Sequence, residues 1–332
     1  GAEIEKIIKY LAWLFNWNDF LNASDKIFST IETELGKAKD QIAKVSSYKA
    51  ELSKYMTLPA GVGDKSLAQH CGITIPDNLG AEEIDIARTL GDQAGDGEID
   101  IIQLQNASAG EIVFTRGATE ALNLVAQTFG RQHVGAGDEV LVSMLEHHAN
   151  LVPWHMLCRE RGAVLRPIPL DGEGQIDLDR FESLLGPRVR LVAVAHVSNV
   201  LGTINPVRQI AARAHDAGAL VLVDGAQSVP HLPVNVQELG ADFLAFSGHK
   251  MCGPTGIGVL WGRRQVLESM PPFMGGGSMI RSVSLYESTY ADVPARFEAG
   301  TPAIGEAIAL GEAVDFLTDV GMEKIFAHEQ HL

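Results

Sequence analysis

Cysteine is scarce in this 332-residue chain, which contains only Cys71, Cys158 and Cys252. Because their number is odd and no CxxC pair occurs, the sequence predicts neither a disulfide framework nor a zinc knuckle. Long apolar runs are missing too: Leu191–Val197 has the length of a strand and is far too short to span a membrane. No charged-then-apolar signal segment opens the sequence. We therefore expect a soluble, cytoplasmic protein of a reducing compartment, with no membrane partner.

Basic residues are few: the chain has 26 Lys and Arg but 42 Asp and Glu, which gives a net charge of -16. Nucleic-acid binding needs clustered Lys and Arg, so we expect no nucleic-acid partner. One acidic segment, Asp92–Asp100, has the spacing and central glycine of a calcium loop. However, Ala94 occupies one ligand position, and Gln103 stands where a bidentate Glu is expected. We interpret the segment as an exposed acidic turn and expect no metal site.

The composition changes twice along the chain. Residues 1–57 mix apolar positions with Lys and Glu at a spacing of three and four residues, which predicts a helical N-terminal region. Residues 58–105 are richer in Gly, Pro and Asp, which indicates a linker or irregular segment. Residues 106–332 follow a regular alternation of β-rich apolar runs and helical stretches, and we expect them to form the large domain.

This alternation predicts an α/β fold, a mostly parallel sheet with helices on both faces. The expected strands are Glu111–Thr115, Glu139–Met144, Val164–Leu170, Arg190–Val197, Leu220–Asp224, Asp242–Phe246 and Gly256–Trp261. The expected helices are Thr119–Phe129, Leu151–Gly162, Leu178–Leu185 and Val207–Ala217. In such sheets the ligand binds outside the carboxyl ends of the strands, so the residues that follow each strand are the candidates for chemistry.

Two of the segments that follow strands suit a phosphate and a flat ring. Phe114–Glu120 runs from a strand through Gly117 into a helix, whose first turn offers free N–H groups and the Thr119 hydroxyl to an anion. The plain alternative is an ordinary helix N-cap. In Glu146–Asn150, the imidazole of His147 can stack on a heteroaromatic cofactor, or it can simply belong to a loop that caps the next helix.

Two further segments suit the reactive end of such a cofactor. The strand in Val221–Ser228 ends in Asp224, whose carboxylate would keep a pyridinium nitrogen protonated, although Asp also ends strands for other reasons. Lys250 lies between a strand and a glycine-rich turn, where its amine can form a Schiff base and later move a proton. Ser247 and His249 lie close enough to bind a phosphate. For Lys250 alone, the alternative is a solvated loop lysine.

Six motifs together make the sequence recognisable. From about Asn106 to Leu332 it resembles the group II (Suf-type) cysteine desulfurases, within the class V aminotransferase family. The motifs are Arg116–Ala126, Glu146–Trp154, His196–Thr203, Val223–Gln227, Ser247–Lys250 and Arg296–Pro302. The resemblance implies the large domain of the PLP-dependent transferase fold type I, with pyridoxal 5'-phosphate (PLP) as the cofactor.

The resemblance also implies roles for individual residues. Lys250 and His147 would be catalytic, the first binding the cofactor covalently and the second stacking over its ring. The remaining contacts would be Asp224 to the pyridine nitrogen, Gln227 to the ring hydroxyl, Asn199 beside cofactor and substrate, and Thr119, Ser247 and His249 to the phosphate. Thr301 would reach the phosphate of a neighbouring subunit and Gly275–Ser278 would line the dimer side, so a homodimer is implied.

Members of this family continue past the position that matches Leu332, into a small C-terminal domain with the cysteine nucleophile and a substrate-binding arginine. We find no match to that domain, and we expect Cys71, Cys158 and Cys252 to be buried or inert. The resemblance therefore implies a desulfurase that converts L-cysteine to L-alanine and passes sulfur to a Suf-type acceptor for iron–sulfur cluster assembly, impaired in this chain alone. The alternatives are a catalytically incomplete PLP-fold scaffold whose helical N-terminus binds a partner, and a selenocysteine lyase or epimerase-like relative.

Overall fold

The computed structural model describes residues 107–332 of the chain. The predictions for residues 1–57 and 58–105, and for the acidic turn at Asp92–Asp100, lie outside the described residues. Within residues 107–332, no helix combines the length and the apolar character needed to cross a bilayer. The same residues hold no cluster of three or more His, Cys, Asp or Glu side chains arranged to bind a metal ion.

The domain is built on a seven-stranded sheet with the order β1-β7-β6-β5-β4-β2-β3. The strands are β1 (Ile112–Thr115), β2 (Glu139–Ser143), β3 (Val164–Ile168), β4 (Val189–Ala195), β5 (Leu220–Asp224), β6 (Phe243–Ser247) and β7 (Gly258–Gly262). Only β7 runs antiparallel to its neighbours β1 and β6, so the other strands all point the same way. The prediction of a mostly parallel sheet is confirmed, and each strand begins and ends within two residues of the predicted bounds.

All four predicted helices are present, one of them with an irregularity, and five further helices among residues 107–332 were not predicted. The helices are α5 (Ala118–Val125), α6 (Arg131–His133), α7 (Val152–Arg161), α8 (Leu178–Leu184), α9 (Val207–Asp216), α10 (Val236–Leu239), α11 (Arg264–Ser269), α12 (Ile304–Val320) and α13 (Met322–Glu329). The predicted helix Thr119–Phe129 is not uniform, because a π-helical turn, η2 (Ala126–Gly130), follows α5 and leads into α6. The Thr128 hydroxyl donates to the Leu124 carbonyl at 2.6 Å, a side-chain bond of the kind that perturbs a regular helix.

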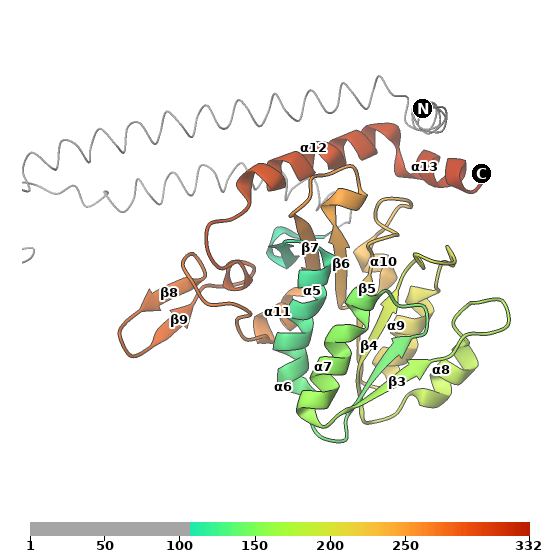
Figure 1. The fold of residues 1–332 in the computed structure, drawn as a ribbon, viewed down its shortest axis with the longest axis horizontal. Helices are drawn as coiled ribbons and strands as arrows, with labels where there is room; N and C mark the ends of the chain where they lie inside the picture. Colours follow the sequence, from blue (N-terminus) through green and yellow to red (C-terminus); the bar gives the residue numbers. More distant parts are fainter. Residues whose placement is uncertain (1–106) are drawn as a thin grey trace, which may run out of the picture. The chain divides into compact units, whose positions relative to one another are not determined.

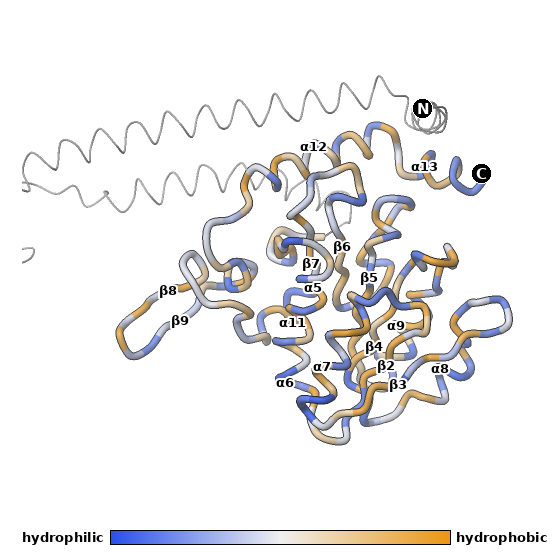
Figure 2. The backbone as a smooth tube through the Cα atoms, viewed as in Figure 1, coloured by the Kyte–Doolittle hydropathy of each residue, from blue (hydrophilic) through white to orange (hydrophobic). Residues whose placement is uncertain are grey.

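Helices cover both faces of the sheet, as Figure 1 shows: α5, α6 and α7 lie over one face, and α9 lies over the other. Alternate residues of the strands form the core under α5 and α7, including Val140 and Val142 of β2 and Leu191 and Ala193 of β4. The strands are accordingly the most hydrophobic part of the chain trace (Figure 2). Strands buried on both faces explain why their apolar runs were continuous in the sequence.

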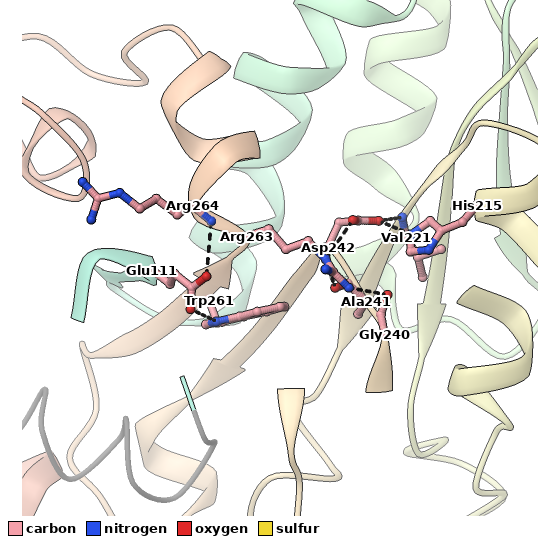
Figure 3. Close-up of polar contacts among 9 residues, drawn as sticks. All are labelled: Glu111, His215, Val221, Gly240, Ala241, Asp242, Trp261, Arg263 and Arg264. Carbon is pink, nitrogen blue, oxygen red and sulfur yellow. Dashed lines mark hydrogen bonds and ion pairs between the residues drawn. The ribbon is translucent and has the colours of Figure 1, made fainter. Parts of the chain in front are cut away.

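A polar cluster stabilises the amino edge of the sheet (Figure 3). The buried carboxylate of Asp242, just before β6, accepts from the Val221 N–H at 2.8 Å and lies 2.8 Å from His215 Nε2 and 3.2 Å from Arg263 Nε. Nearby, Glu111 accepts from Trp261 Nε1 and from the Arg264 N–H, both at 3.3 Å. These contacts join α9, β5, β6 and β7 at the amino edge of the sheet. The predicted site residues lie at the opposite, carboxyl edge.

Two features lie outside the sheet. A hairpin of β8 (Ile280–Val283) and β9 (Ser288–Tyr290) projects away from the domain (Figure 1). Residues 107–332 also contain four short 3-10 turns: η1 (Ala109–Glu111), η3 (His148–Asn150), η4 (Gly248–Lys250) and η5 (Ala295–Phe297).

Candidate active site

The predicted chemical residues meet at the carboxyl edge of the sheet because the strands that carry them are parallel neighbours. Asp224 ends β5, and it lies in register with Ala195 of β4 on one side and Ala245 of β6 on the other. The segments that follow β2, β4, β5 and β6 therefore emerge side by side. They bring His147, Asn199, Asp224 and Lys250 to one edge.

The start of α5 forms an anion cradle next to β6. The Ser247 hydroxyl, at the end of β6, accepts from the Ala118 N–H at 2.8 Å. The strand between them, β7, has no side chain at Gly258, where an added Cβ would lie 2.4 Å from Gly117 Cα and 2.6 Å from the Phe246 carbonyl oxygen. This close approach brings the helix N-terminus and a serine hydroxyl together, an arrangement suited to a phosphate.

Asp224 is a buried carboxylate near Lys250 and His147. It is 6% exposed, and its Oδ1 accepts from the Ala226 N–H at 2.9 Å. Burial raises the pKa of Asp224 above its usual value, while the Ala226 N–H and the charges of Lys250 and His147 act in the opposite direction. A carboxylate in this setting is poised to bind a protonated ring nitrogen.

Lys250 is exposed at the end of η4, and α12 packs against the loop that carries it. An added Cβ at Gly253 would lie 2.9 Å from the Gly248 carbonyl oxygen and 3.0 Å from Leu310 Cδ1 of α12. The glycines thus allow α12 to pack closely on the loop. Between them, Cys252 adopts a left-handed backbone conformation with φ of 64°.

The other residues predicted to contact the cofactor are exposed or half-buried. Thr119 and His249 are exposed, and so is Asn199, in the turn after β4. Gln227 is half-buried in the turn that follows Asp224. These side chains lie in the segments that follow the strands at the carboxyl edge or, for Thr119, in the first turn of α5.

Thr301 is exposed and lies on a different segment from the rest of the predicted site. The adjacent Gly300 N–H donates to the Gly277 carbonyl at 2.9 Å, so this segment runs beside Gly275–Ser278. Within residues 107–332, no recorded contact joins Thr301 to Asp224 or Ser247. The two segments predicted to face a second subunit are therefore neighbours.

Sequence reasoning gave no role to Glu146. Its carboxylate accepts from the Ala195 N–H at 2.8 Å and from Asn150 Nδ2 at 2.5 Å, and it also bonds the Ser143 hydroxyl. Burial raises the pKa of Glu146 to about 7, and the negative charge of Asp224 contributes in the same direction. Glu146 lies directly before His147, within the motif Glu146–Trp154. The motif shows that the glutamate is present, but it does not show which groups its side chain contacts.

The fold and this edge define a member of the class V aminotransferases, a family of PLP-dependent enzymes: that family matches residues 85–332, and the chain belongs to it. Among curated relatives, a probable cysteine desulfurase of Halalkalibacterium halodurans is 53% identical over 226 residues, which cover 68% of this chain and 56% of the relative. The chain spans about half the length of the curated relatives it matches, 56% and 53% of the first two.

Solved structures of cysteine desulfurases resemble the chain as well. CsdA from Escherichia coli has a TM-score of 0.69 and 39% identity, over 82% of this chain and 64% of that one. The enzyme from Thermococcus onnurineus has a TM-score of 0.71 and 40% identity, over 74% of this chain and 61% of that one. The chain is thus a homologue of PLP-dependent cysteine desulfurases, and the family match begins inside the segment 58–105.

Proposed function

We propose that this chain binds pyridoxal 5'-phosphate at the carboxyl edge of its sheet, and that the whole protein is a cysteine desulfurase. The observation that carries the proposal is the buried Asp224 carboxylate near Lys250 and His147, next to the anion cradle of Ser247 and α5. A cofactor with a phosphate at one end and a protonatable ring nitrogen at the other fits both features. The substrate would be L-cysteine, with L-alanine and transferable sulfur as products.

Each residue of the edge then has a task. Lys250 attaches the cofactor and moves a proton at the substrate Cα, and His147 stacks over the ring. The other contacts are Asp224 to the ring nitrogen, Gln227 to the ring hydroxyl, Asn199 beside the substrate, and Thr119, Ser247 and His249 to the phosphate. When bound, PLP serves as an electron sink for the bonding electrons of Cα. Asp224 supports this by keeping the ring nitrogen protonated.

The sulfur step requires a thiolate, and the described thiols are poor candidates. Burial raises the pKa of the Cys158 thiol to about 11, and burial also raises the pKa of the Cys252 thiol. Both are therefore protonated at neutral pH. We propose that neither accepts the sulfur and that this chain releases little sulfide; the third cysteine, Cys71, lies outside the described residues.

The first test is the absorption spectrum of the purified chain with added PLP, followed by measurement of alanine and sulfide after L-cysteine is supplied. We expect a visible band from the lysine-bound cofactor that survives dialysis, because a covalent bond holds it. A double variant, Cys158→Ala with Cys252→Ala, should release sulfide at the same low rate as the unchanged chain.

Two outcomes would contradict the proposal in different ways. Absence of the band would favour a scaffold without cofactor over an enzyme. A large drop in sulfide release in the double variant would show that a described thiol takes part. The desulfurase homologues favour an enzyme that acts on cysteine over a scaffold or a selenocysteine-specific or epimerase-like relative.

We further propose a homodimer, in which Thr301 completes the phosphate site of the other copy. Support comes from the exposed position of Thr301 and from the β8–β9 hairpin, whose tip presents Leu285 and Tyr286 at 95% and 96% exposure. Val283, on β8, is 65% exposed. Contiguous exposed apolar side chains of this kind mark interaction surfaces.

Changing both tip residues, as Leu285→Ser with Tyr286→Ser, should weaken the dimer about tenfold or more, since each large side chain would lose its buried contacts. Light scattering over a dilution series measures this. Leu332→Ser, at another exposed leucine, is the control. An unchanged dimer in the double variant would argue against the hairpin as an interface.

We propose a Suf-type sulfur carrier as the acceptor and the cytoplasm as the location. Both follow from the resemblance of the six motifs to the group II desulfurases. The deficit of basic residues supports a partner other than nucleic acid.

A further inference from the structure

The Glu146 carboxylate links both ends of the loop that carries His147 to the neighbouring strand. Its Oε1 bonds the Ser143 hydroxyl at the end of β2 and accepts from the Ala195 N–H at the end of β4, the latter at 2.8 Å. Its Oε2 accepts from Asn150 Nδ2 at 2.5 Å. Ser143 and Asn150 are 2% and 0% exposed and Glu146 is half-buried, so these bonds are partly shielded from water, which strengthens hydrogen bonds to a charged group.

The orientation of Asn150 makes a carboxylate the required partner. Trp154 Nε1 donates to Asn150 Oδ1 at 3.0 Å, and an indole N–H has no acceptor capacity. The amide oxygen of Asn150 must therefore face Trp154, which turns its NH2 group toward Glu146. Because the Ala195 N–H is also a donor, position 146 needs acceptor oxygens on both sides.

His147 lies within the segment that these bonds fix. It caps η3, and its Nδ1 accepts from the Ala149 N–H at 3.1 Å, which sets the orientation of the ring relative to its own loop. The Glu146 bonds set the position of that loop relative to β4. The position of this loop therefore sets where the imidazole lies at the carboxyl edge of the sheet.

We propose that Glu146 is a positioning residue of the cofactor site, whose carboxylate holds the His147 loop against β4 so that the imidazole lies over the bound ring. The inference rests on the proposed function, because it assigns to Glu146 a task that has meaning only if PLP binds there. The hydrogen bonds of Glu146 stabilise its ionised form against the burial that opposes it. A loop anchored by a single buried carboxylate is sensitive to that one side chain.

The test uses the full chain with PLP and compares Glu146→Gln with the unchanged protein. Glutamine keeps one acceptor oxygen, but its NH2 group must then face a donor, either Asn150 Nδ2 or the Ala195 N–H. We expect the dissociation constant of PLP, measured by equilibrium dialysis, to rise about 10- to 100-fold, the size expected from losing one charge-assisted hydrogen bond. The visible circular dichroism of the bound cofactor should change as well, because the stacked ring would shift.

Glu139→Gln is the matched control. Glu139 is also a nearly buried glutamate of β2, but it lies at the amino edge of the sheet, paired with Arg166 at 2.9 Å and Arg188 at 3.1 Å. Both substitutions disturb a buried polar cluster, so both should lower the unfolding temperature. Only Glu146→Gln should alter PLP affinity and the circular dichroism of the cofactor.

A double-mutant cycle separates positioning from general damage. If Glu146 acts through His147, then Glu146→Gln should have little further effect on PLP affinity once His147→Ala is present. Additive effects, or unchanged affinity and circular dichroism in Glu146→Gln, would overturn the inference. If the unchanged chain fails to bind PLP at all, the proposed function is at fault instead.

Discussion

Replacing Lys250 with alanine should abolish the visible band of the lysine-bound cofactor and reduce turnover by about 10²- to 10⁴-fold or more, the size expected for losing a general base. Lys250 lies at the carboxyl edge, close enough to Asp224 for its charge to lower the pKa of that carboxyl. Among residues 107–332 no other lysine lies at this edge, because the only other lysine of these residues is Lys324 of α13. The measurement is the spectrum of the variant with added PLP, with and without L-cysteine.

Lys324→Ala is the matched control for that experiment. Lys324 is exposed on α13, and its replacement should leave the band and the rate unchanged. Reduction with borohydride followed by peptide mapping gives a second measure, with the cofactor expected on the peptide that contains Lys250. Recovery of the label on another lysine, or a full band in Lys250→Ala, would show that the attachment site is wrong.

Gly258→Ala should have the largest effect on the fold. The added methyl group would meet the backbone of Gly117 at 2.4 Å and of Phe246 at 2.6 Å, and neither can move without shifting α5 or β6. We expect the free energy of unfolding to fall by about 3 kcal/mol or more, at the upper end of the cost of overpacking. The same shift separates the α5 N-terminus from Ser247, so the affinity for PLP should fall too. Urea unfolding and equilibrium dialysis measure the two effects.

Gly305→Ala provides the comparison for that substitution. Gly305 lies in the first turn of α12, and an added Cβ would have no neighbour within 4 Å. Alanine there should be neutral or stabilising by about 0.5–1 kcal/mol, because it restricts the unfolded chain. Equal unfolding midpoints for Gly258→Ala and Gly305→Ala would mean that the contact between β7 and α5 is looser than described.

The strands were predictable because burial on both faces leaves continuous apolar runs, as in β5, where the predicted and observed bounds agree at Leu220–Asp224. The direction of β7 was not predictable in the same way. Its residues are buried whether it runs parallel or antiparallel, so its apolar run carries no information about direction. The π-helical turn η2 was also missed, since Thr128 competes for the Leu124 carbonyl only in the folded helix.

For a related reason, some residues of the candidate site could be identified from the sequence and others could not. Asp224 and Lys250 could be identified because Asp224 ends a strand and Lys250 lies in the turn after one, at the edge where a parallel sheet presents its functional side chains. Glu146 also follows a strand, but its importance depends on Ala195 and Asn150, and Ala195 lies 49 residues away along the chain. A sequence motif records that such a residue is present, whereas its partners become visible only when β2 and β4 are paired.

The polar cluster around Asp242 and the candidate site lie at opposite edges of the sheet. Asp242, His215 and Arg263 hold the strands together at the amino edge, while Asp224 and Lys250 lie at the carboxyl edge of the same two strands, β5 and β6. Natural variants at the amino edge therefore change how much folded protein a cell maintains, through chaperones and proteases that act on unfolded chains. Variants of Asp224 and Lys250 at the carboxyl edge are instead expected to change cofactor binding, so the amount of folded protein and the cofactor affinity of each molecule should be measured separately.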